Sequence, residues 1–222
     1  MEKLLNGEII GQLKGVFAQL KEPVQILFFG SDDGCDYCGE TQQLLEEVSV
    51  IDSRIGLSKY NLDDDAEVAK QFNIDRAPGI VIAGKDGDQI LDFGIQYSGI
   101  PSGHEFSTLI NDIILVSGRD SGLSTQARDI LKKLDKPLHM QVFVTPTCPY
   151  CPRAVLLAHK MAMENPGMIR AEGVEATEFP DLDNRFGVSG VPQTTINAGA
   201  GTIIGAVPEN QLIIEIMRAM AS

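Results

Sequence analysis

The segment VFVTPTCPYCPRAVLLAHK, from Val142 to Lys160, decides the fold of this chain. Two of its cysteines lie three positions apart, at the point where an apolar strand pattern gives way to helical spacing. The segment ILFFGSDDGCDYCGETQQLLEEV, from Ile26 to Val48, has the same layout. Together the two Cys-x-x-Cys pairs use all four cysteines of the chain. The pairs could serve as metal ligands, as structural disulfides or as two redox centres.

The two segments belong to a longer internal repeat. Their first cysteines, Cys35 and Cys148, are 113 positions apart, and the second cysteines have the same offset. Pro78 and Pro192, which each precede an apolar run, are 114 positions apart. Further on, a glycine, a proline and a helical run follow in the same order in both halves. Landmarks that recur at a nearly constant offset indicate two copies of one structural unit.

Hydrophobic spacing predicts the same order of elements in both copies. Each copy begins with a helix, a short apolar strand and the cysteine-bearing helix, then a second strand and a short helix, and ends with a hairpin and a closing helix. In the first copy, KDGD between GIVIAG and QILDFG predicts the turn of the hairpin. The segment SGRDSGLS, residues 117–124, has the composition of a linker. We expect an α/β protein of two tandem domains, residues 1–118 and 119–222, each a central mixed β-sheet flanked by helices.

The composition disfavours several kinds of partner. The net charge of −13 leaves no basic stripe for nucleic acid and disfavours an anionic membrane surface. No segment offers the roughly 18 uninterrupted apolar residues of a membrane span, and the first 20 residues lack the apolar core of a signal peptide. We expect a cytoplasmic protein with no nucleic-acid and no membrane partner. In that compartment, paired cysteines are more often catalytic or metal-binding than permanent crosslinks.

The position of each cysteine pair favours redox chemistry. The first sulfur lies at a helix N-terminus, where backbone N–H groups and the helix dipole stabilise an anion, so the reactive thiolate forms more readily. The second sulfur lies one turn further and can close a disulfide or resolve a mixed disulfide. Acidic residues surround Cys35, whereas no charged residue closely precedes Cys148 and Arg153 follows its partner. We therefore expect Cys148 to be the more acidic thiol, and its disulfide the more oxidising.

Two other interpretations of the cysteines remain open. Four cysteines suffice for a structural zinc site or an iron–sulfur cluster, but zinc modules hold their two pairs about 12 to 20 residues apart. Here each pair belongs to a separate copy of the repeat. The cysteines could also be purely structural. The redox interpretation is favoured, with no metal and no cofactor beyond the redox-active disulfides.

The two prolines can also be interpreted in two ways. A proline before an apolar run can simply begin a strand. A cis X-Pro bond in a loop that faces the cysteines would instead present the backbone of the preceding residue, Ala77 or Val191, to a bound peptide. Because a cysteine pair accompanies each proline, we favour the cis form of both Pro78 and Pro192.

The motifs resemble a known family. CPYC at Cys148–Cys151 resembles the glutaredoxin active site, and GVP at Gly190–Pro192 matches the proline loop of the thioredoxin superfamily. The whole chain resembles the glutaredoxin-like protein disulfide oxidoreductases, in which two thioredoxin-like domains follow in tandem. The resemblance implies reduction, formation or isomerisation of protein disulfides, with a thioredoxin reductase-like flavoenzyme as reductant. Carried over, the attacking cysteines are Cys35 and Cys148, the resolving cysteines are Cys38 and Cys151, and the peptide-facing loops are Ala77-Pro78 and Val191-Pro192.

Other functions are compatible with these motifs. CDYC departs from the familiar dipeptides of the family, and no basic set for glutathione is evident. The double thioredoxin fold at the N-terminus of alkyl hydroperoxide reductase flavoproteins is similar in architecture, which makes an electron-donor module for a peroxidase one alternative. A non-catalytic peptide-binding or chaperone-like protein is another. His104, His139 and His159 show no ligand spacing, and we expect ordinary surface or helix histidines.

Overall fold

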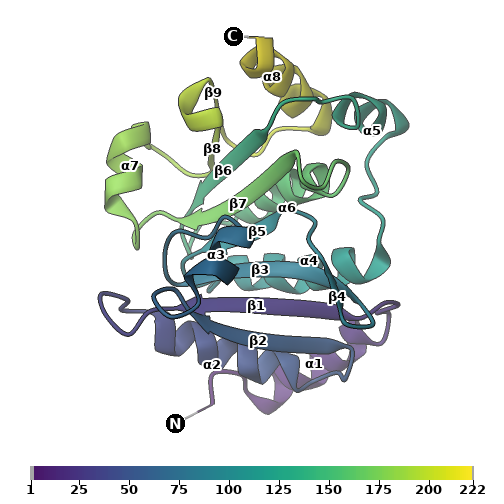
Figure 1. Cartoon of the computed structure of the whole chain (residues 1–222), viewed down its shortest axis with the longest axis vertical. Helices are drawn as coiled ribbons and strands as arrows, with labels where there is room; N and C mark the ends of the chain where they lie inside the picture. Colours follow the sequence, from purple (N-terminus) through teal and green to yellow (C-terminus); the bar gives the residue numbers. More distant parts are fainter. Residues whose placement is uncertain (1–2, 222) are drawn as a thin grey trace.

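One continuous β-sheet runs through the molecule. The computed structural model describes residues 3–221, and in this part of the chain nine strands form a sheet of order β2-β1-β3-β5-β7-β6-β8-β9, with β4 paired to β3 (Figure 1). The strands are β1 (Val24–Gly30), β2 (Ile55–Asn61), β3 (Gly79–Asp86), β4 (Gln89–Leu91), β5 (Ile95–Ser98), β6 (Leu138–Val144), β7 (Ile169–Glu175), β8 (Gln193–Ile196) and β9 (Gly201–Ile204).

The helices repeat in the order that the sequence predicts. They are α1 (Gly7–Phe17), α2 (Cys38–Ser49), α3 (Ala66–Gln71), α4 (Glu105–Gly118), α5 (Thr125–Leu131), α6 (Cys151–Ala162), α7 (Pro180–Phe186) and α8 (Glu209–Ala221), with a 3-10 turn η1 (Asn197–Gly199). The mixed α/β class and the two similar units are confirmed. The predicted boundary between residues 118 and 119 falls between α4 and α5 and stays a prediction. None of the helices within residues 3–221 is long and apolar enough to cross a membrane.

The strand that joins the two units is not evident in the sequence. Hydrophobic spacing predicts one hairpin strand over residues 89–94, but β4 ends at Leu91 and a separate strand, β5, follows Gly94. Strand β5 pairs antiparallel with β3 and parallel with β7 of the second unit. Gly94 has a φ of +71° and accepts a hydrogen bond from Ala171 N at 2.8 Å. A Cβ at Gly94 would clash with the Ile169 carbonyl oxygen, so this close approach of the two units requires glycine.

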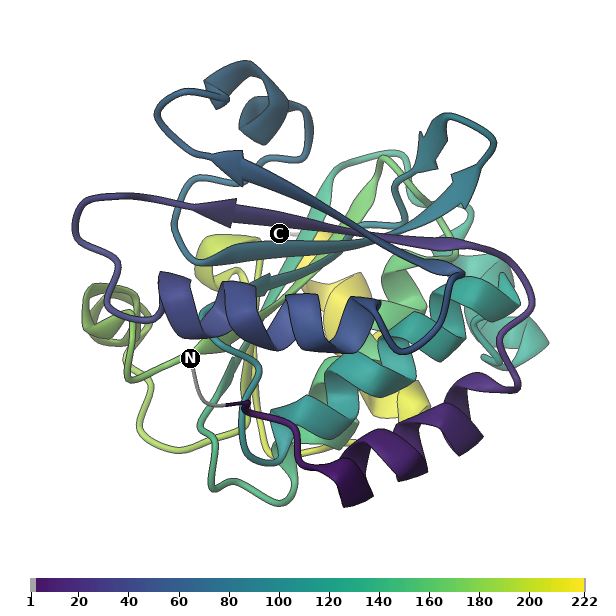
Figure 2. The ribbon, with the colours of Figure 1, turned by 90° about the horizontal axis from the view of Figure 1, so that it is seen from below.

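The two faces of the sheet carry different helices. One large core cluster, with residues from α1, α2, α4, α5, α6 and α8, runs through both units, while α3 and α7 cover smaller clusters on the other face. Figure 2 shows α1, α2 and α4 below the sheet and α3 above it. Strand β1 is buried throughout: Ile26 and Phe28 face the large core, and Leu27 and Phe29 face α3. Burial on both faces explains the uninterrupted apolar run in its sequence.

Candidate active sites

Both cysteine pairs lie at the same edge of the sheet. Strands β1, β2, β5, β7 and β6 all run parallel, because β1 and β5 each pair antiparallel with β3. The first pair follows the carboxyl end of β1 and the second follows the carboxyl end of β6. Four strand-to-strand steps separate β1 from β6. At about 4.8 Å a step, the two pairs lie on the order of 19 Å apart, which rules out one metal site shared by all four cysteines.

The second centre is the more buried one. Cys148 and Cys151 form a disulfide with a Cα–Cα distance of 5.5 Å. Cys151 is fully buried and Cys148 is 7% exposed, whereas Tyr150 between them is 64% exposed. The Cys151 backbone N–H, in the first turn of α6, donates to Cys148 Sγ at 3.1 Å. This bond places a backbone donor of the helix N-terminus on the Cys148 sulfur; stabilisation of the thiolate stays a prediction. Pro149 lies in the turn before α6.

The first centre has the same shape in an acidic setting. Cys35 and Cys38 form a disulfide, again with a Cα–Cα distance of 5.5 Å, and α2 begins at Cys38. Both cysteines are half-buried and Tyr37 is 43% exposed. The acidic residues of the loop and first turn are all exposed to solvent: Asp32, Asp33, Asp36 and Glu40.

The proline loops lie beside the two centres. Both the Ala77-Pro78 and the Val191-Pro192 bonds are cis, in agreement with the sequence-based preference. Pro78 immediately precedes β3, whose Gly79 pairs with Phe29 near the end of β1. Pro192 immediately precedes β8, which pairs in the same way with β6. The register therefore places each proline next to the loop that carries the cysteines of its own unit. Ala77 and Val191 are half-buried, while both prolines are buried.

A buried carboxyl group behind the second centre escapes sequence reasoning. Glu105, in the first turn of α4, is 3% exposed, and burial raises its pKa to about 7. Its Oε2 accepts a hydrogen bond from Thr108 Oγ1 at 2.8 Å, whereas Oε1 is buried without a partner. The start of α4 is fixed to the loop before Cys148 because His104 N donates to Pro146 O at 2.9 Å.

Helix α4 packs along α6, the helix that begins with Cys151. Because α4 starts beside Pro146, Glu105 lies at the end of the second unit where α6 begins with Cys151. The sequence holds a signal for this site, because Glu105, Thr108 and Asp112 are polar residues on the buried face of α4, among Leu109, Ile110 and Ile113.

A second buried polar group joins the two units. Asp112 Oδ2 accepts a hydrogen bond from the Tyr97 hydroxyl and lies 2.7 Å from His159 Nδ1. The other ring nitrogen of His159 lies 3.2 Å from Gln96 O in β5. Burial and the Asp112 carboxylate raise the pKa of Tyr97 well above its usual value. The sequence predicts an ordinary surface or helix histidine at position 159, but His159 is fully buried and links α6 to the first unit.

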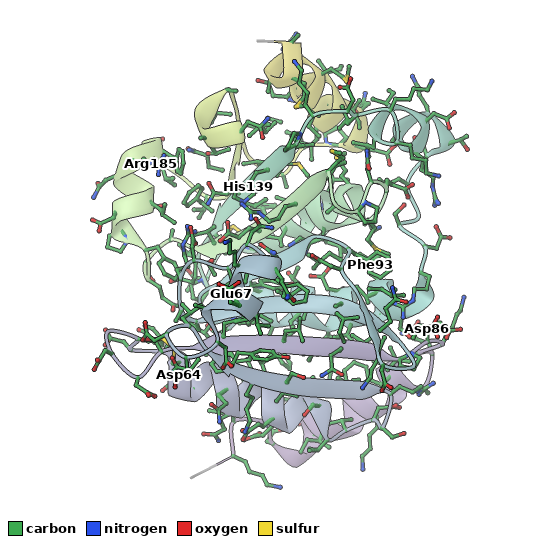
Figure 3. All side chains as sticks on the ribbon, viewed as in Figure 1. Asp64, Glu67, Asp86, Phe93, His139 and Arg185 are labelled. Atoms are coloured by element: carbon green, nitrogen blue, oxygen red, sulfur yellow. A yellow bond between two sulfur atoms is a disulfide. The ribbon has the colours of Figure 1, made fainter. Side chains whose placement is uncertain are left out.

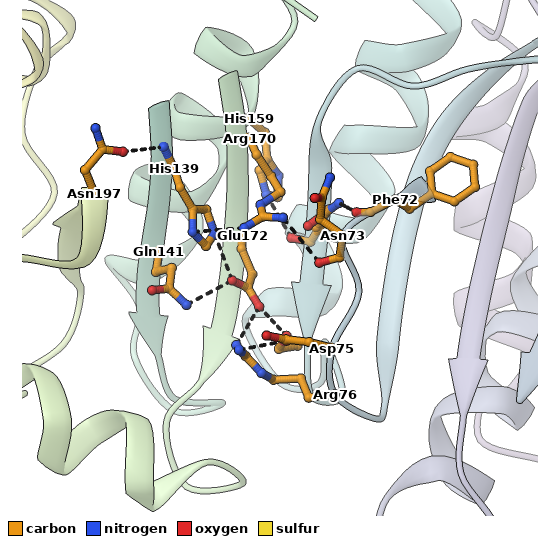
Figure 4. Close-up of polar contacts among 12 residues, drawn as sticks. Phe72, Asn73, Asp75, Arg76, His139, Gln141, His159, Arg170, Glu172 and Asn197 are labelled. Atoms are coloured by element: carbon orange, nitrogen blue, oxygen red, sulfur yellow. Dashed lines mark hydrogen bonds and ion pairs between the residues drawn. The ribbon is translucent and has the colours of Figure 1, made fainter. Parts of the chain in front are cut away.

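On the opposite face of the sheet, Glu172 of β7 is surrounded by donors (Figure 4). Arg76, Ser98 and Gln141 donate to its carboxylate, and His139 Nε2 lies 3.1 Å from Oε2. Arg76 immediately precedes the Ala77-Pro78 loop, so this contact ties the first proline loop to the second unit. Within residues 3–221, no group of three or more His, Cys, Asp or Glu side chains is arranged to hold a metal ion.

The sequence and fold of this chain are similar to those of known proteins. The thioredoxin domain family model matches residues 138–218. A protein disulfide oxidoreductase from Aeropyrum pernix is 29% identical, with a TM-score of 0.87 over 96% of this chain and 94% of the other. The NTD_N/C domain of alkyl hydroperoxide reductase AhpF from Enterococcus faecalis is 28% identical, with a TM-score of 0.85 over 96% of this chain and 99% of the other.

The chain is a tandem thioredoxin-fold protein. The F component of alkyl hydroperoxide reductase in Staphylococcus aureus is 30% identical over 166 residues, which is 74% of this chain but 29% of that protein. The tandem thioredoxin-fold chain thus spans less than a third of the curated relatives that it matches. Its fold and its two disulfides support dithiol–disulfide exchange.

Proposed function

We propose that this protein is a thiol–disulfide oxidoreductase that reduces, forms or isomerises disulfides in other proteins. The observation that carries the proposal is the arrangement repeated in both units: a disulfide at a helix N-terminus, beside a cis-proline loop. In each unit the first cysteine attacks and the second resolves. The attacking residues are Cys35 and Cys148, and the resolving residues are Cys38 and Cys151.

The reducing direction at the second centre proceeds in two exchanges. The Cys148 thiolate attacks one sulfur of a substrate disulfide, that disulfide breaks, and the other substrate sulfur leaves as a thiolate that takes up a proton. The Cys151 thiolate then attacks Cys148 in the mixed disulfide and releases the second substrate thiol. Two electrons pass to the substrate and the Cys148–Cys151 disulfide is formed. The oxidising direction is the reverse of these steps, and neither needs a cofactor beyond the disulfides.

Glu105 supplies the proton acceptor for the second exchange. The Cys151 thiol is fully buried, so its proton cannot pass directly to bulk water. Glu105 lies behind α6 with an unpartnered oxygen and a pKa of about 7, near the pH at which the exchange must run. It accepts the proton when Cys151 attacks and returns it when the centre is reduced again.

The proline loops supply the binding of substrate. A peptide that lies against Ala77-Pro78 or Val191-Pro192 would extend along the exposed side of the loop and bring its sulfur in line with the attacking cysteine. The exposed tyrosines at the two centres, Tyr37 and Tyr150, offer apolar surface beside the disulfide.

Turnover with insulin disulfides and dithiothreitol tests the proposal. Wild type is expected to reduce insulin, and the Cys35→Ser/Cys148→Ser variant is expected to lose this activity. Each single variant reports the share of one centre. If wild type binds a cysteine-free peptide but reduces no disulfide, the protein is a peptide-binding module and the proposal fails.

A second function is favoured by the relatives. Because the Staphylococcus aureus relative is a component of alkyl hydroperoxide reductase, we propose as an alternative that this chain passes electrons to a peroxidase. The electrons would come from a thioredoxin reductase-like flavoenzyme in the cytoplasm. Peroxide-dependent oxidation of the reduced protein in the presence of a thiol peroxidase, and not in its absence, would favour this alternative over general disulfide reduction.

A further inference from the structure

The two centres differ in charge at matched positions of the repeat. Residues 31–40, around the first pair, contain four acidic residues and no basic one. The equivalent residues 144–153, around the second pair, contain one basic residue, Arg153, and no acidic one. The side chains of Arg153 and of the four acidic residues are exposed. The loop and first turn around the first pair therefore carry a net negative charge, whereas those around the second pair carry a single positive charge.

The neighbouring strand adds to the negative charge of the first centre. Gly30 at the end of β1 pairs with Asn61 at the end of β2, and Leu62 N donates to Gly30 O at 2.9 Å. Asp63 and Asp64 follow directly and are exposed. Figure 3 shows Asp64 at this edge of the sheet. The topology thus places two more carboxylates beside the loop of the first disulfide.

Two cations near the first centre are already paired with other carboxylates. Arg76, two residues before Pro78, is ion-paired with Asp75 and Glu172 at 2.8 and 3.0 Å. Lys59 is ion-paired with Glu46 on α2 at 2.9 Å. Within the described chain, no ion pair engages the carboxylates that flank Cys35, which are Asp32, Asp33 and Asp36. These charges are free to act on a docking partner.

We propose that the two centres divide their substrates by charge, so that the first centre takes disulfides flanked by lysine or arginine and the second takes disulfides in neutral or acidic surroundings. The inference rests on the proposed oxidoreductase function and uses the same exchange steps. Exposed charges act mainly on the rate of encounter, and salt screens them within about 8 to 10 Å. Charge selection should therefore appear in kcat/KM at low ionic strength.

Two single-centre proteins separate the centres. The Cys148→Ser/Cys151→Ser variant keeps the first centre, and the Cys35→Ser/Cys38→Ser variant keeps the second. Each is assayed with two disulfide peptides that differ only in lysine or glutamate flanks. For the first centre, we expect kcat/KM to favour the lysine peptide by about tenfold at low salt, with most of the preference lost at high salt. For the second centre, we expect a ratio near one or below.

A matched pair of charge variants shows whether the selection is local. Asp33→Asn/Asp36→Asn is made in the first-centre protein, and Asp86→Asn/Asp88→Asn removes the same net charge from the β3–β4 turn. Asp86 lies at the opposite end of the sheet from Asp64 (Figure 3). The readout is the ratio of kcat/KM for the lysine peptide to kcat/KM for the glutamate peptide. A change in thiol reactivity acts on both peptides equally and leaves this ratio unchanged. We expect it to fall several-fold in the first variant and to stay unchanged in the second.

The outcomes decide between the inference and the function on which it rests. Turnover of both peptides at equal rates by the first centre overturns charge selection and leaves the oxidoreductase function standing. An equal fall of the ratio in both charge variants also overturns it, because net charge would then act instead of the local surface. If neither single-centre protein reduces either peptide, the proposed function fails and the inference fails with it.

Discussion

Arg76 Nη1 lies 3.0 Å from Glu172 Oε1, so the residue that precedes the first proline loop is paired with a buried carboxylate of the second unit. Burial by itself would raise the pKa of Glu172, but the hydrogen bond from His139 and the charge of Arg76 lower it to about 2, against an ordinary value of 4.5. The two thioredoxin-like units are therefore joined by polar contacts as well as by the pairing of β5 with β7.

Glu172 is expected to make the fold sensitive to acid. Its folded pKa lies below its unfolded pKa, so its stabilisation is complete above about pH 4.5 and is lost as the pH falls towards about 2. The shift corresponds to about 3 kcal/mol. Urea unfolding at several pH values should show that the free energy of unfolding falls more steeply for wild type than for Glu172→Gln over this range. The exposed Glu8→Gln variant is the control and should follow wild type. Parallel curves for wild type and Glu172→Gln would contradict the assignment.

The contact between Arg76 and Glu172 shows where sequence-based prediction ends. The cysteine pairs and Pro78 can be found because each is a local motif beside an apolar strand. Strand β5 cannot, because one of its two neighbours, β7, belongs to the other copy, and nothing local distinguishes Ile95–Ser98 from a continuation of the hairpin.

The buried polar residues escape prediction for a related reason. Asp112 and His159 are 47 positions apart, and only the packing of α4 on α6 brings them together. A single histidine on a helix looks the same in sequence whether it is exposed or buried. Polar residues on the buried face of α4 are the visible sign in the sequence. A buried carboxylate such as Asp112 needs hydrogen-bond partners from other elements, and here Tyr97 and His159 supply them.

Glu105→Gln is expected to slow exchange at the second centre. A correctly positioned general acid or base accelerates a reaction by about 10²- to 10⁴-fold. We therefore expect Glu105→Gln to lower the rate of the resolving step at least tenfold. In wild type the rate of this step should rise with an inflection near pH 7, and the variant should lack the inflection. The measurement is stopped-flow release of substrate from the mixed disulfide, in a protein that keeps only Cys148 and Cys151.

Glu178 provides the matched control for this experiment. Burial raises its pKa to about 7 as well, but its carboxylate accepts a hydrogen bond from Ile100 N in the connection between β5 and α4. Glu178→Gln should keep the inflection. If this variant loses the inflection and Glu105→Gln keeps it, the proton acceptor has been assigned to the wrong carboxylate.

Glu105→Gln should also stabilise the fold at alkaline pH. Because the folded pKa of Glu105 lies above its unfolded value, its contribution to stability is present below about pH 4.5 and is lost as the pH rises through about 7. Glu105→Gln removes the cost of ionising a buried carboxyl group. The gain of the variant over wild type in the free energy of unfolding should therefore grow by up to about 3 kcal/mol between about pH 5 and about pH 8. Thermal or urea unfolding measures the difference. A gain that does not change with pH would show that Glu105 ionises as freely in the folded protein as in the unfolded chain.

Cys148 is expected to react as a thiolate at lower pH than Cys35. The hydrogen bond from Cys151 N acts on the Cys148 sulfur, whereas exposed carboxylates surround Cys35 and oppose a second negative charge. Alkylation rates of the two attacking cysteines should be followed against pH in variants that retain one cysteine each. The Asp33→Asn/Asp36→Asn change, made with Cys35 as the retained cysteine, should move its titration towards that of Cys148. Equal apparent pKa values for the two thiols would remove the electrostatic ranking of the centres.

The two centres are expected to exchange electrons between molecules and not within one. Direct exchange requires the attacking sulfur to reach a sulfur of the other disulfide, and the order of strands between β1 and β6 keeps the pairs on the order of 19 Å apart. Within residues 3–221, a shared core and one continuous sheet join the two units across this gap. When wild type is half-reduced and allowed to equilibrate, electrons should pass from one centre to the other by collisions between molecules. The apparent rate constant for this transfer should therefore rise in proportion to the protein concentration. Rapid alkylation and mass spectrometry of the two cysteine peptides follow the transfer.

Mixing the Cys35→Ser/Cys38→Ser and Cys148→Ser/Cys151→Ser proteins, one reduced and one oxidised, gives the intermolecular rate constant directly, and wild type should match it. A transfer rate in wild type that does not depend on concentration would establish a relay from Cys35 and Cys38 to the second centre, and with it a motion of the units that the continuous sheet does not provide.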